Sequence, residues 1–318
     1  MRAPARTNSL AGQKSRYLFG RQALGVWQLD CFLGRRAEVR TVRLLDPISR
    51  NCVPNRHALE SAMKIVIVSD IHGNYDALSN LPEDYDQLWV LGDLVNYGPQ
   101  PAEVVSFVRN RATYVVRGNH DHCVGFGETS RCPPRFREMA ETTRKYTAEV
   151  LSENDKKYLR SLPLHVDVWV GKMRCRLCHA PPSDPPFTNS PTHAEQLNDE
   201  CRRVGAEVFL VGGGHAWFGR KVGLALLANP GSLGQPRSGE SVASYAVFKE
   251  GKLSFRSFHY PVNLTAEKIR AMPISAVIRS ELITILRTGM IPQERRQSVV
   301  VGSIAGERSP RNVIDPTG

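Results

Sequence analysis

Apolar runs of strand length alternate with helical patterns along the chain from residue 64 onward. Six runs are long enough for a buried strand, at 64–69, 87–91, 113–116, 165–170, 173–178 and 207–211. Patterns with a helical period lie between some of them, at 101–110 and 192–204. Runs that are apolar on both faces and alternate with helices are typical of a sheet that is covered on both sides. The pattern therefore predicts an α/β fold.

The pattern changes after Leu224. The runs "LALLAN" and "SYAVFKEGKLSFRSF" predict antiparallel strands, with Glu250 and Gly251 as a hairpin turn. The next segment predicts a helix with Gly289 as its C-cap. Five apolar residues are expected on one face of that helix: Ile274, Val277, Ile278, Leu282 and Ile285.

Four segments are expected along the chain. Residues 1–62 form a basic extension without sustained periodicity, which we leave out of the fold. Such a segment could be an organellar transit peptide. It could also be sequence upstream of the native start, which we favour because Met63 directly precedes the first strand. A globular domain is expected over 63–263, a helical segment packed on it over 264–288, and a disordered tail over 289–318.

The distribution of charge and cysteine restricts the class of protein. A net charge of +11 would suggest a nucleic acid partner, but residues 1–62 hold eleven basic and four acidic residues. The remaining chain therefore carries only +4, and we do not expect nucleic acid binding. No uncharged apolar run approaches the ~18 residues of a membrane span, so no membrane partner is expected. Seven scattered cysteines favour a reducing cytoplasm.

Polar side chains follow five of the predicted strands. In open α/β sheets, ligands bind at the carboxyl ends of the strands. Here these ends read "DIHGN" at 70–74, "GD" at 92–93, "GNHD" at 118–121, "CH" at 178–179 and "GGH" at 213–215. A single ending of this kind would be an ordinary turn. Five in succession predict a site for borderline ions such as Mn, Fe, Zn or Co.

Together these motifs resemble a known family. "SDIHGN", "GDLVNYGPQP", "VRGNHD", a later histidine at a strand end and "NPGSLGQPR" are similar to the calcineurin-like metallophosphoesterases, in particular their small bacterial phosphodiesterase/phosphatase branch. The resemblance covers roughly Met63 to Arg287. It implies a four-layer α-β-β-α sandwich of two mixed β-sheets. It also implies a hydrolase acting on phosphoric ester bonds of a small molecule, a nucleotide or a phosphoprotein.

The resemblance further implies two divalent metal ions, which could be Mn, Fe, Zn, Ni or Co, with Mn favoured. Carried over by position, Asp70 and His72 would bind the first ion, and Asp93 would bridge both. Asn119 and His179 would bind the second ion. His215 would be a ligand in either alignment considered below.

The candidate catalytic residues are His120 and Asp121. By the same resemblance His120 would not bind metal but would stabilise charge on the leaving oxygen or protonate it, which suits an imidazole. Asp121 and Asn74 would be orienting residues. Two ions with a shared carboxylate activate a bridging water for in-line attack on phosphorus, so a metal-bridging hydroxide is expected as nucleophile.

The stretch "VGGGHAW" departs from the family pattern Gly-His-x-His, because it contains one histidine. If Gly214 and His215 are the family's Gly-His, Trp217 replaces the second histidine. If the strand and the downstream residues align without gaps, Gly213 replaces the first histidine and His215 is the second. We prefer the gapless alignment, since the other requires a two-residue insertion. A degenerate family member with one metal ion or none, acting as a binding or regulatory module, is the alternative function.

Other motifs receive plainer interpretations. "CRLCH" at 175–179 matches a haem attachment pattern, but no signal peptide precedes it, and we expect Cys175 and Leu177 on one strand face and Cys178 on the other. The proline-rich segment 180–191 is a surface connection or a wall of the substrate pocket. Arg237 could meet a substrate phosphate or brace a loop. Three histidines are expected to be structural: His122, His165 and His193.

Overall fold

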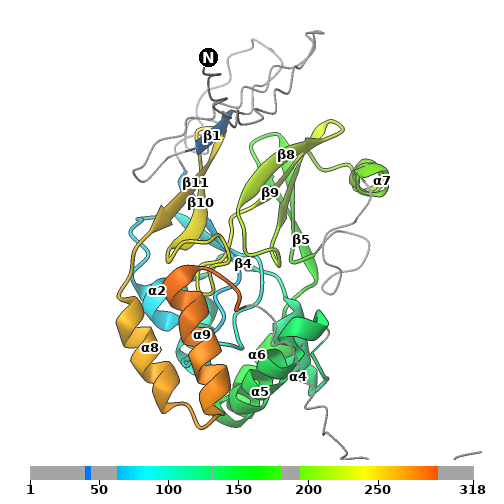
Figure 1. Cartoon of the computed structure of the whole chain (residues 1–318). Coiled ribbons are helices and arrows are strands. Elements are labelled where there is room, and N and C mark those ends of the chain that lie inside the picture. Colours follow the sequence, from blue (N-terminus) through cyan, green and yellow to red (C-terminus); the bar gives the residue numbers. More distant parts are fainter. Residues whose placement is uncertain (1–39, 44–62, 131, 181–193, 293–318) are drawn as a thin grey trace, which may run out of the picture.

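Two β-sheets form the centre of the protein in a computed structural model that describes residues 40–43, 63–130, 132–180 and 194–292 (Figure 1). The first sheet has six strands in the order β1 (Arg40–Arg43), β11 (Lys252–Phe258), β10 (Ala243–Lys249), β2 (Ile65–Val68), β3 (Gln87–Val90) and β4 (Tyr114–Val115). The second has five, in the order β5 (His165–Val170), β6 (Met173–Cys178), β7 (Val208–Val211), β9 (Ala225–Asn229) and β8 (Phe218–Val222).

Both sheets are mixed. In the first, β2, β3 and β4 run parallel, and β10 and β11 continue the sheet antiparallel. In the second, β6, β7 and β9 run parallel, whereas β5 and β8 are antiparallel to their neighbours. The expected antiparallel arrangement after Leu224 is confirmed for β10 with β11 and for β9 with β8, but β9 also pairs parallel with β7. Strand β8, which was not predicted, turns the chain back, and its exposed Arg220 and Lys221 interrupt the apolar run that would have marked it.

The two sheets pack face to face through a shared apolar core. Trp89 and Ile67 from the first sheet lie against Leu177 and Leu210 from the second. All four side chains are buried. The strands that carry them were predicted from continuous apolar runs, and burial on both faces is the physical reason for those runs.

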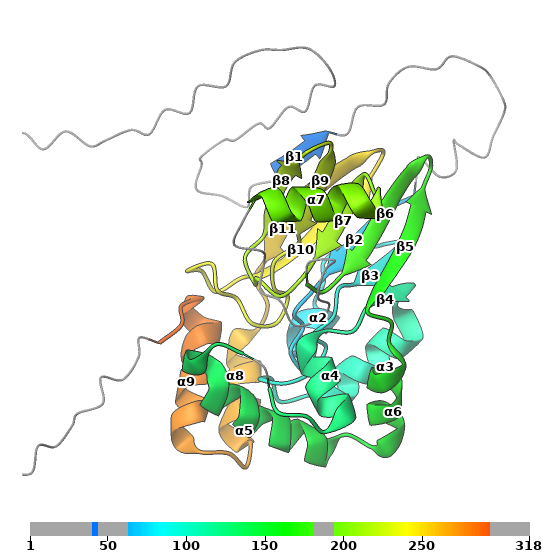
Figure 2. The same ribbon diagram turned by 90° about the vertical axis from the view of Figure 1, so that its right-hand side faces the viewer.

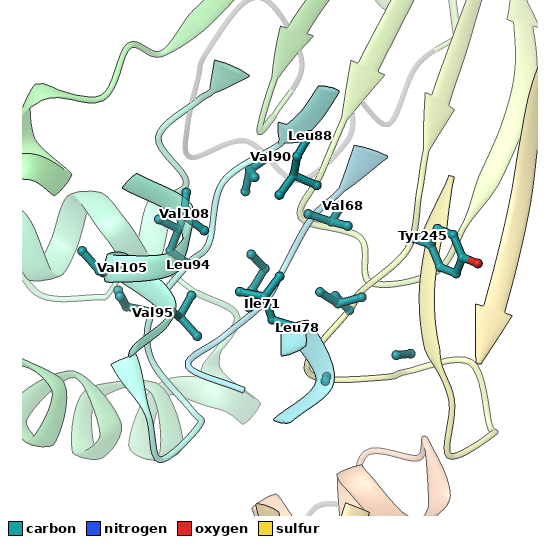
Figure 3. Close-up of a cluster of buried hydrophobic side chains, with 14 of the residues drawn as sticks. Val68, Ile71, Leu78, Leu88, Val90, Leu94, Val95, Val105, Val108 and Tyr245 are labelled. Carbon is teal, nitrogen blue, oxygen red and sulfur yellow. The ribbon is translucent and has the colours of Figure 1, made fainter. Parts of the chain in front are cut away.

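Helices cover the outer face of each sheet. The outer face of the first sheet packs against α2 (Tyr75–Ser79), α3 (Pro101–Arg111), α4 (Asn119–Phe126) and α6 (Glu153–Ser161). Figure 3 shows part of this cluster, with Val68 and Val90 of the sheet facing Val105 and Val108 of α3. Helix α7 (Ala194–Val204) lies across the second sheet (Figure 2). The four-layer α-β-β-α sandwich is therefore confirmed.

A third group of helices lies below the sheets in Figure 1 and consists of α5 (Pro134–Val150), α8 (Val262–Ala271) and α9 (Ala276–Thr288). Helix α9 ends as predicted, because Gly289 has a φ of 63° and donates its N–H to the Ile285 carbonyl at 2.8 Å. Ile278 and Leu282 are buried, but Val277 is 40% exposed. Its assignment to the buried face is wrong, because the position next to Ile278 turns about 100° around the helix.

Part of the N-terminal extension belongs to the first sheet. Strand β1 pairs antiparallel with β11, with Arg40 opposite Phe255 and Arg43 opposite Lys252. Leaving all of residues 1–62 out of the fold is therefore wrong for these four residues. The pairing satisfies backbone groups that β11 would otherwise expose at the sheet edge. Predictions on the rest of that extension, on 181–193 with His193, and on 293–318 lie outside the described residues.

The cysteines of "CRLCH" occupy the two faces of β6 as expected. Cys175 and Leu177 point into the core between the sheets, and Cys178 packs against the α7 side with Cys201. All three cysteines are buried, and none of them forms a disulfide with another described residue. Among the described helices, none is long and apolar enough to cross a membrane.

Candidate metal centre

Polar side chains from both sheets converge where the parallel strands end. The segments after β2 and β3 bring the first sheet's side chains, and those after β6 and β7 bring the second sheet's. The converging residues are Asp70 and His72 after β2, Asp93 after β3, Asn119 and His120 at the start of α4, His179 after β6 and His215 after β7. Asn119 is half-buried and the others are buried. The predicted strand endings thus meet at one place.

One group that could hold a metal ion consists of Asp70, His72 and His215. The Nε2 atoms of the two histidines are 3.2 Å apart. Asp70 Oδ1 lies 3.3 Å from His215 Nε2 and 3.8 Å from His72 Nε2. The three ligand atoms therefore surround one point.

A second group consists of Asp70, Asp93 and His179. His179 Nε2 is 3.2 Å from Asp93 Oδ2 and 3.2 Å from Asn119 Oδ1. Asp93 Oδ2 is also 3.8 Å from His72 Nε2, so this oxygen lies between histidines of the two groups. Asp70 belongs to both groups. The geometry thus offers two adjacent sites that share carboxylates.

The protonation of the three histidines suits a cation. Each ring places Nδ1 at hydrogen-bonding distance from a backbone carbonyl oxygen, which can only accept. The partners are Val95 for His72 at 3.1 Å, Leu91 for His179 at 2.7 Å and Gln235 for His215 at 2.8 Å. The proton of each neutral ring is therefore on Nδ1, and the Nε2 lone pair faces the site. Histidines that bind metals usually donate their other ring N–H to a carbonyl or carboxylate oxygen in this way.

Several hydrogen-bond acceptors consequently face one another in this site without a donor between them. The lone pairs of His72 and His215 point at each other, and the buried Asp70 Oδ1 has no hydrogen-bond donor among the described residues. Buried acceptors without a donor are destabilising, and a cation relieves that cost. The donor set of imidazole nitrogen and carboxylate oxygen suits Mn, Fe, Zn or Co. The residues present therefore fit a metal ion.

The backbone at the site is strained. Four candidate ligands have a left-handed backbone conformation, which is rare for residues other than glycine. Their φ angles are 52° for Asp70, 49° for His72, 55° for Asp93 and 56° for His215. Each such residue costs on the order of 1–3 kcal/mol, and such residues cluster at functional sites.

His120 differs from the other histidines. Its Nδ1 is 2.7 Å from the amide nitrogen of Asn96, which donates to it in the orientation of the structure. The proton of the neutral His120 ring is therefore on Nε2, which lies 4.0 Å from Asp93 Oδ2. His120 presents a donor to the site where His72, His179 and His215 present acceptors.

Asp121 and Asn74 hold the surrounding loops. The buried Asp121 carboxylate accepts hydrogen bonds from the backbone N–H groups of Asp93, Leu94 and Gly118, at 2.8, 2.8 and 2.9 Å. Gly118 must be glycine, because a Cβ there would overlap the Asp93 carboxylate. Asn74 caps α2 and donates to the Gly234 carbonyl at 2.9 Å. Neither side chain belongs to the two ligand groups.

Burial and mutual attraction set the charge of the site. Burial alone would raise the pKa of Asp93, but the neighbouring His179 and His120 outweigh this effect and hold the pKa well below its usual range. The Asp93 carboxylate is therefore ionised. Burial lowers the pKa of His179, but Asp93 outweighs this effect and raises it to about 10. Burial also raises the pKa of Asp70 to about 6 and lowers the pKa of His72 and His215 well below the usual range. The metal-free site therefore holds a His179–Asp93 ion pair beside two neutral histidines.

The glycine-rich loop is divided between the two groups. His215 lies in the first group, with Asp70 and His72. A Cβ on Gly213 would lie 3.4 Å from His179 Nε2, in the second group. Trp217 lies outside both groups, because its ring stacks on Phe255 at 5.4 Å. The position without a histidine is therefore beside His179.

Sequence reasoning missed Asn96 and Tyr97. Both have positive φ angles, of 72° and 61°, and the Tyr97 ring lies 4.7 Å from His72 and 4.8 Å from His120. They belong to the "GDLVNYGPQP" loop, whose letters indicate a turn but do not indicate which side chains point inward.

Comparison with known proteins gives a consistent result. Residues 63–252 match the model of the calcineurin-like phosphoesterase superfamily domain. The uncharacterized protein MJ0912 of Methanocaldococcus jannaschii is 31% identical over 229 residues, which are 64% of this chain and 91% of that protein. The symmetrical bis(5'-nucleosyl)-tetraphosphatase of Nitrosococcus oceani is 43% identical over 67 residues, 19% of this chain. That match spans only 24% of the tetraphosphatase.

Two solved structures are similar. A metallophosphoesterase from Sphaerobacter thermophilus is 28% identical with a TM-score of 0.59, and the match covers 72% of this chain and 100% of that one. The hypothetical protein PH1004 from Pyrococcus horikoshii is 21% identical with a TM-score of 0.61, covering 72% and 99%. The second likeness shows the fold alone.

Proposed function

Because this chain belongs to the calcineurin-like phosphoesterase superfamily, we propose that it is a metal-dependent phosphoesterase that hydrolyses phosphomonoesters or phosphodiesters. The observation that carries the proposal is the convergence of the His72 and His215 lone pairs, the His179–Asp93 ion pair and the buried Asp70 Oδ1, which has no hydrogen-bond donor among the described residues. A bound cation would satisfy these acceptors, which supports the proposal.

The proposed ligands combine the two groups with Asn119, whose Oδ1 lies 3.2 Å from His179 Nε2. Asp70, His72 and His215 would hold the first ion, as the gapless alignment expects. Asp93, Asn119 and His179 would hold the second, with Asp93 Oδ2 between the two because it lies 3.2 Å from His179 Nε2 and 3.8 Å from His72 Nε2. Mn is favoured, and Fe, Zn, Ni and Co have suitable chemistry.

Two divalent ions would supply an activated water and a Lewis acid for the phosphoryl oxygens. The protein's own residues then orient the substrate. His120 Nε2–H would donate to the leaving oxygen, and Asn96 fixes the tautomer that makes this possible. Burial lowers the pKa of His120, so a neutral ring would stabilise the developing charge through a hydrogen bond. Asp121 acts as a positioning residue through the backbone of Asp93.

The full chain loaded with Mn, Zn or Co should hydrolyse p-nitrophenyl phosphate or bis-p-nitrophenyl phosphate, and a panel should include nucleotides and dinucleoside polyphosphates. His120→Gln should lower kcat about 10²–10⁴-fold, as removal of a positioned proton donor does. Bound metal, measured by elemental analysis, should stay unchanged. His122→Gln is the matched control, because that ring lies in the same helix and faces Glu128 and Phe126. Loss of metal with His120→Gln would overturn the proposed role.

The alternative is a degenerate member with one ion or none that acts as a binding or regulatory module. Gly213 favours it, because the second group lacks a histidine beside His179. Elemental analysis decides between the two: two ions per chain support the enzyme, and one ion without turnover on any ester supports the module.

The remaining expectations stay predictions. A small phosphate ester, a nucleotide or a phosphoprotein is the expected substrate, and the short tetraphosphatase match makes nucleotides the first to test. A cytoplasmic location is expected from the odd number of scattered cysteines, and no nucleic acid partner is expected.

A further inference from the structure

Arg237 carries a half-buried positive charge, and no carboxylate lies within ion-pair distance of it in the described part of the chain. Its Nη2 donates to Gln235 Oε1 at 2.7 Å, and its guanidinium lies over the Phe136 ring at 4.4 Å. Burial lowers the pKa of Arg237, but a guanidinium stays charged at any physiological pH. A half-buried guanidinium whose neighbours are all uncharged favours an anion.

Arg237 adjoins the candidate metal centre through two neighbours. The first is Tyr97, whose hydroxyl interacts with the guanidinium and whose ring lies against His72 and His120. The second is Gln235, whose backbone oxygen accepts the hydrogen bond of His215 Nδ1 at 2.8 Å. Burial is the main cause of the raised pKa of Asp70 and of the lowered pKa of His215, and the positive charge of Arg237 acts on both groups in the lowering direction.

Two buried donors at this place lack an acceptor. Arg237 Nε and Gln235 Nε2 are both inaccessible to solvent and have no hydrogen-bond partner among the described residues. Both are N–H groups, so the missing partner must offer oxygen lone pairs. Since no described carboxylate lies within ion-pair distance of Arg237, the acceptor that we infer is one supplied by a bound substrate.

We propose that Arg237 and Gln235 bind the non-bridging oxygens of a substrate's terminal phosphate, and that this contact makes dianionic phosphomonoesters the preferred substrates. The inference rests on the proposed function, since it places the phosphate between Arg237 and the metal ions. Two divalent ions with Asp70, Asp93 and Arg237 have a net charge of +3, which favours a dianion over the single charge of a diester. The planar guanidinium also matches the spacing of phosphate oxygens.

The test compares Arg237→Met with Arg135→Met in the metal-loaded full chain. Arg135 is the matched control, because its guanidinium lies over the same Phe136 ring at 4.8 Å but is exposed to solvent. The first readout is binding of inorganic phosphate by calorimetry. The second is the KM and kcat for p-nitrophenyl phosphate and for bis-p-nitrophenyl phosphate. Thermal melting checks that each variant folds.

Arg237→Met should weaken phosphate binding about 10–100-fold, which is the usual worth of hydrogen bonds to a charged group. The KM for the monoester should rise by a similar factor, with a smaller change for the diester, and Arg135→Met should match the wild type. Equal phosphate binding in the Arg237→Met protein, with only a lower melting temperature, would assign Arg237 to bracing Phe136 and overturn the proposal. Equal losses for both esters would overturn the preference for dianions.

If Arg237→Met does not fold, Arg237→Lys is the second variant. It keeps the positive charge and the aliphatic part of the side chain but replaces the planar guanidinium by a single ammonium group. The Arg237→Lys protein should bind phosphate roughly threefold to tenfold more weakly than the wild type, because an ammonium group cannot make the two parallel hydrogen bonds of a guanidinium. Unchanged binding would contradict the proposal. A wild-type protein that binds phosphate but hydrolyses no ester would refute the proposed function and leave the Arg237 site in place.

Discussion

The four histidines of the site differ in the partner of their Nδ1 atom. Carbonyl oxygens fix the proton on Nδ1 of His72, His179 and His215, whereas the Asn96 amide donates to Nδ1 of His120. A sequence cannot specify these partners, because they come from loops far away in the chain. The sequence predicted which histidines meet, and only the structure separates acceptors from the donor.

The pH dependence of metal binding follows from His179. Its pKa is raised to about 10 in the metal-free protein, so a proton occupies Nε2 until a cation replaces it. Asp70, with a pKa of about 6, is already ionised at pH 7 and above and releases no proton in this range. Between about pH 7 and about pH 9, metal affinity at the second site should therefore rise about tenfold per pH unit. Metal titrations in weak buffer should record one proton released; an affinity independent of pH would contradict this assignment.

The same proton stabilises the metal-free fold. A raised histidine pKa contributes stability that is fully present below about pH 6.5 and is lost as pH rises through about 10. Urea denaturation of protein treated with a chelator should show this decline. In His179→Gln protein the decline should disappear.

Gly213→His should restore a ligand to the second group. The new side chain would start 3.4 Å from His179 Nε2, an ordinary contact distance. Because Gly213 has a φ of 74°, histidine there should cost about 1–2 kcal/mol of unfolding free energy without metal. With metal, the second ion should bind more tightly than in the wild type. Gly214→His, whose Cβ would approach Asn229, is the control that should leave the second ion's affinity unchanged.

At the scale of elements, the sequence predicted strands better than helices. Strands β5 and β6 have the predicted bounds, because burial between two layers demands continuous apolar residues. Helix α5 was missed. Its buried face includes Thr143 and Thr147, and Thr143 donates its hydroxyl hydrogen to the Met139 carbonyl at 2.8 Å, so polar residues hide the helical period. The four-residue β1 was missed because its partner β11 lies more than two hundred residues away in the chain.

The turn of the β10–β11 hairpin holds Glu250 in an unfavourable backbone conformation that a substitution can relieve. Its turn residues Glu250 and Gly251 have φ angles of 52° and 69°, as a two-residue hairpin turn requires. Glu250 is exposed. For a residue with a Cβ, the left-handed conformation lowers the free energy of unfolding. Glu250→Gly should raise the free energy of unfolding by about 1 kcal/mol, measured by urea denaturation. Lys249→Gly, within the strand, should lower it; stabilisation by both would point to a charge effect instead.

At the scale of the whole molecule, the proposed ions join the two sheets. Asp70 and Asp93 extend from strands of the first sheet, and His179 and His215 follow strands of the second. Metal should therefore stabilise the whole fold rather than one loop. At a concentration a hundredfold above Kd, one ion should add about 2.7 kcal/mol to the free energy of unfolding. Calorimetry with and without chelator measures this, and an unchanged melting temperature would argue against a shared site.

The left-handed backbone at four candidate ligands has a consequence for the order of folding. A strained turn forms only when its surroundings already hold it in place. At Asp70, His72, Asp93 and His215 those surroundings are completed strands, since the turns follow β2, β3 and β7 and close onto one another. The pocket should thus be the last part of the protein to assemble and the first to relax. In a newly synthesised chain the two sheets would pack before the metal site is complete. Metal would therefore bind only the folded protein and would not direct its folding.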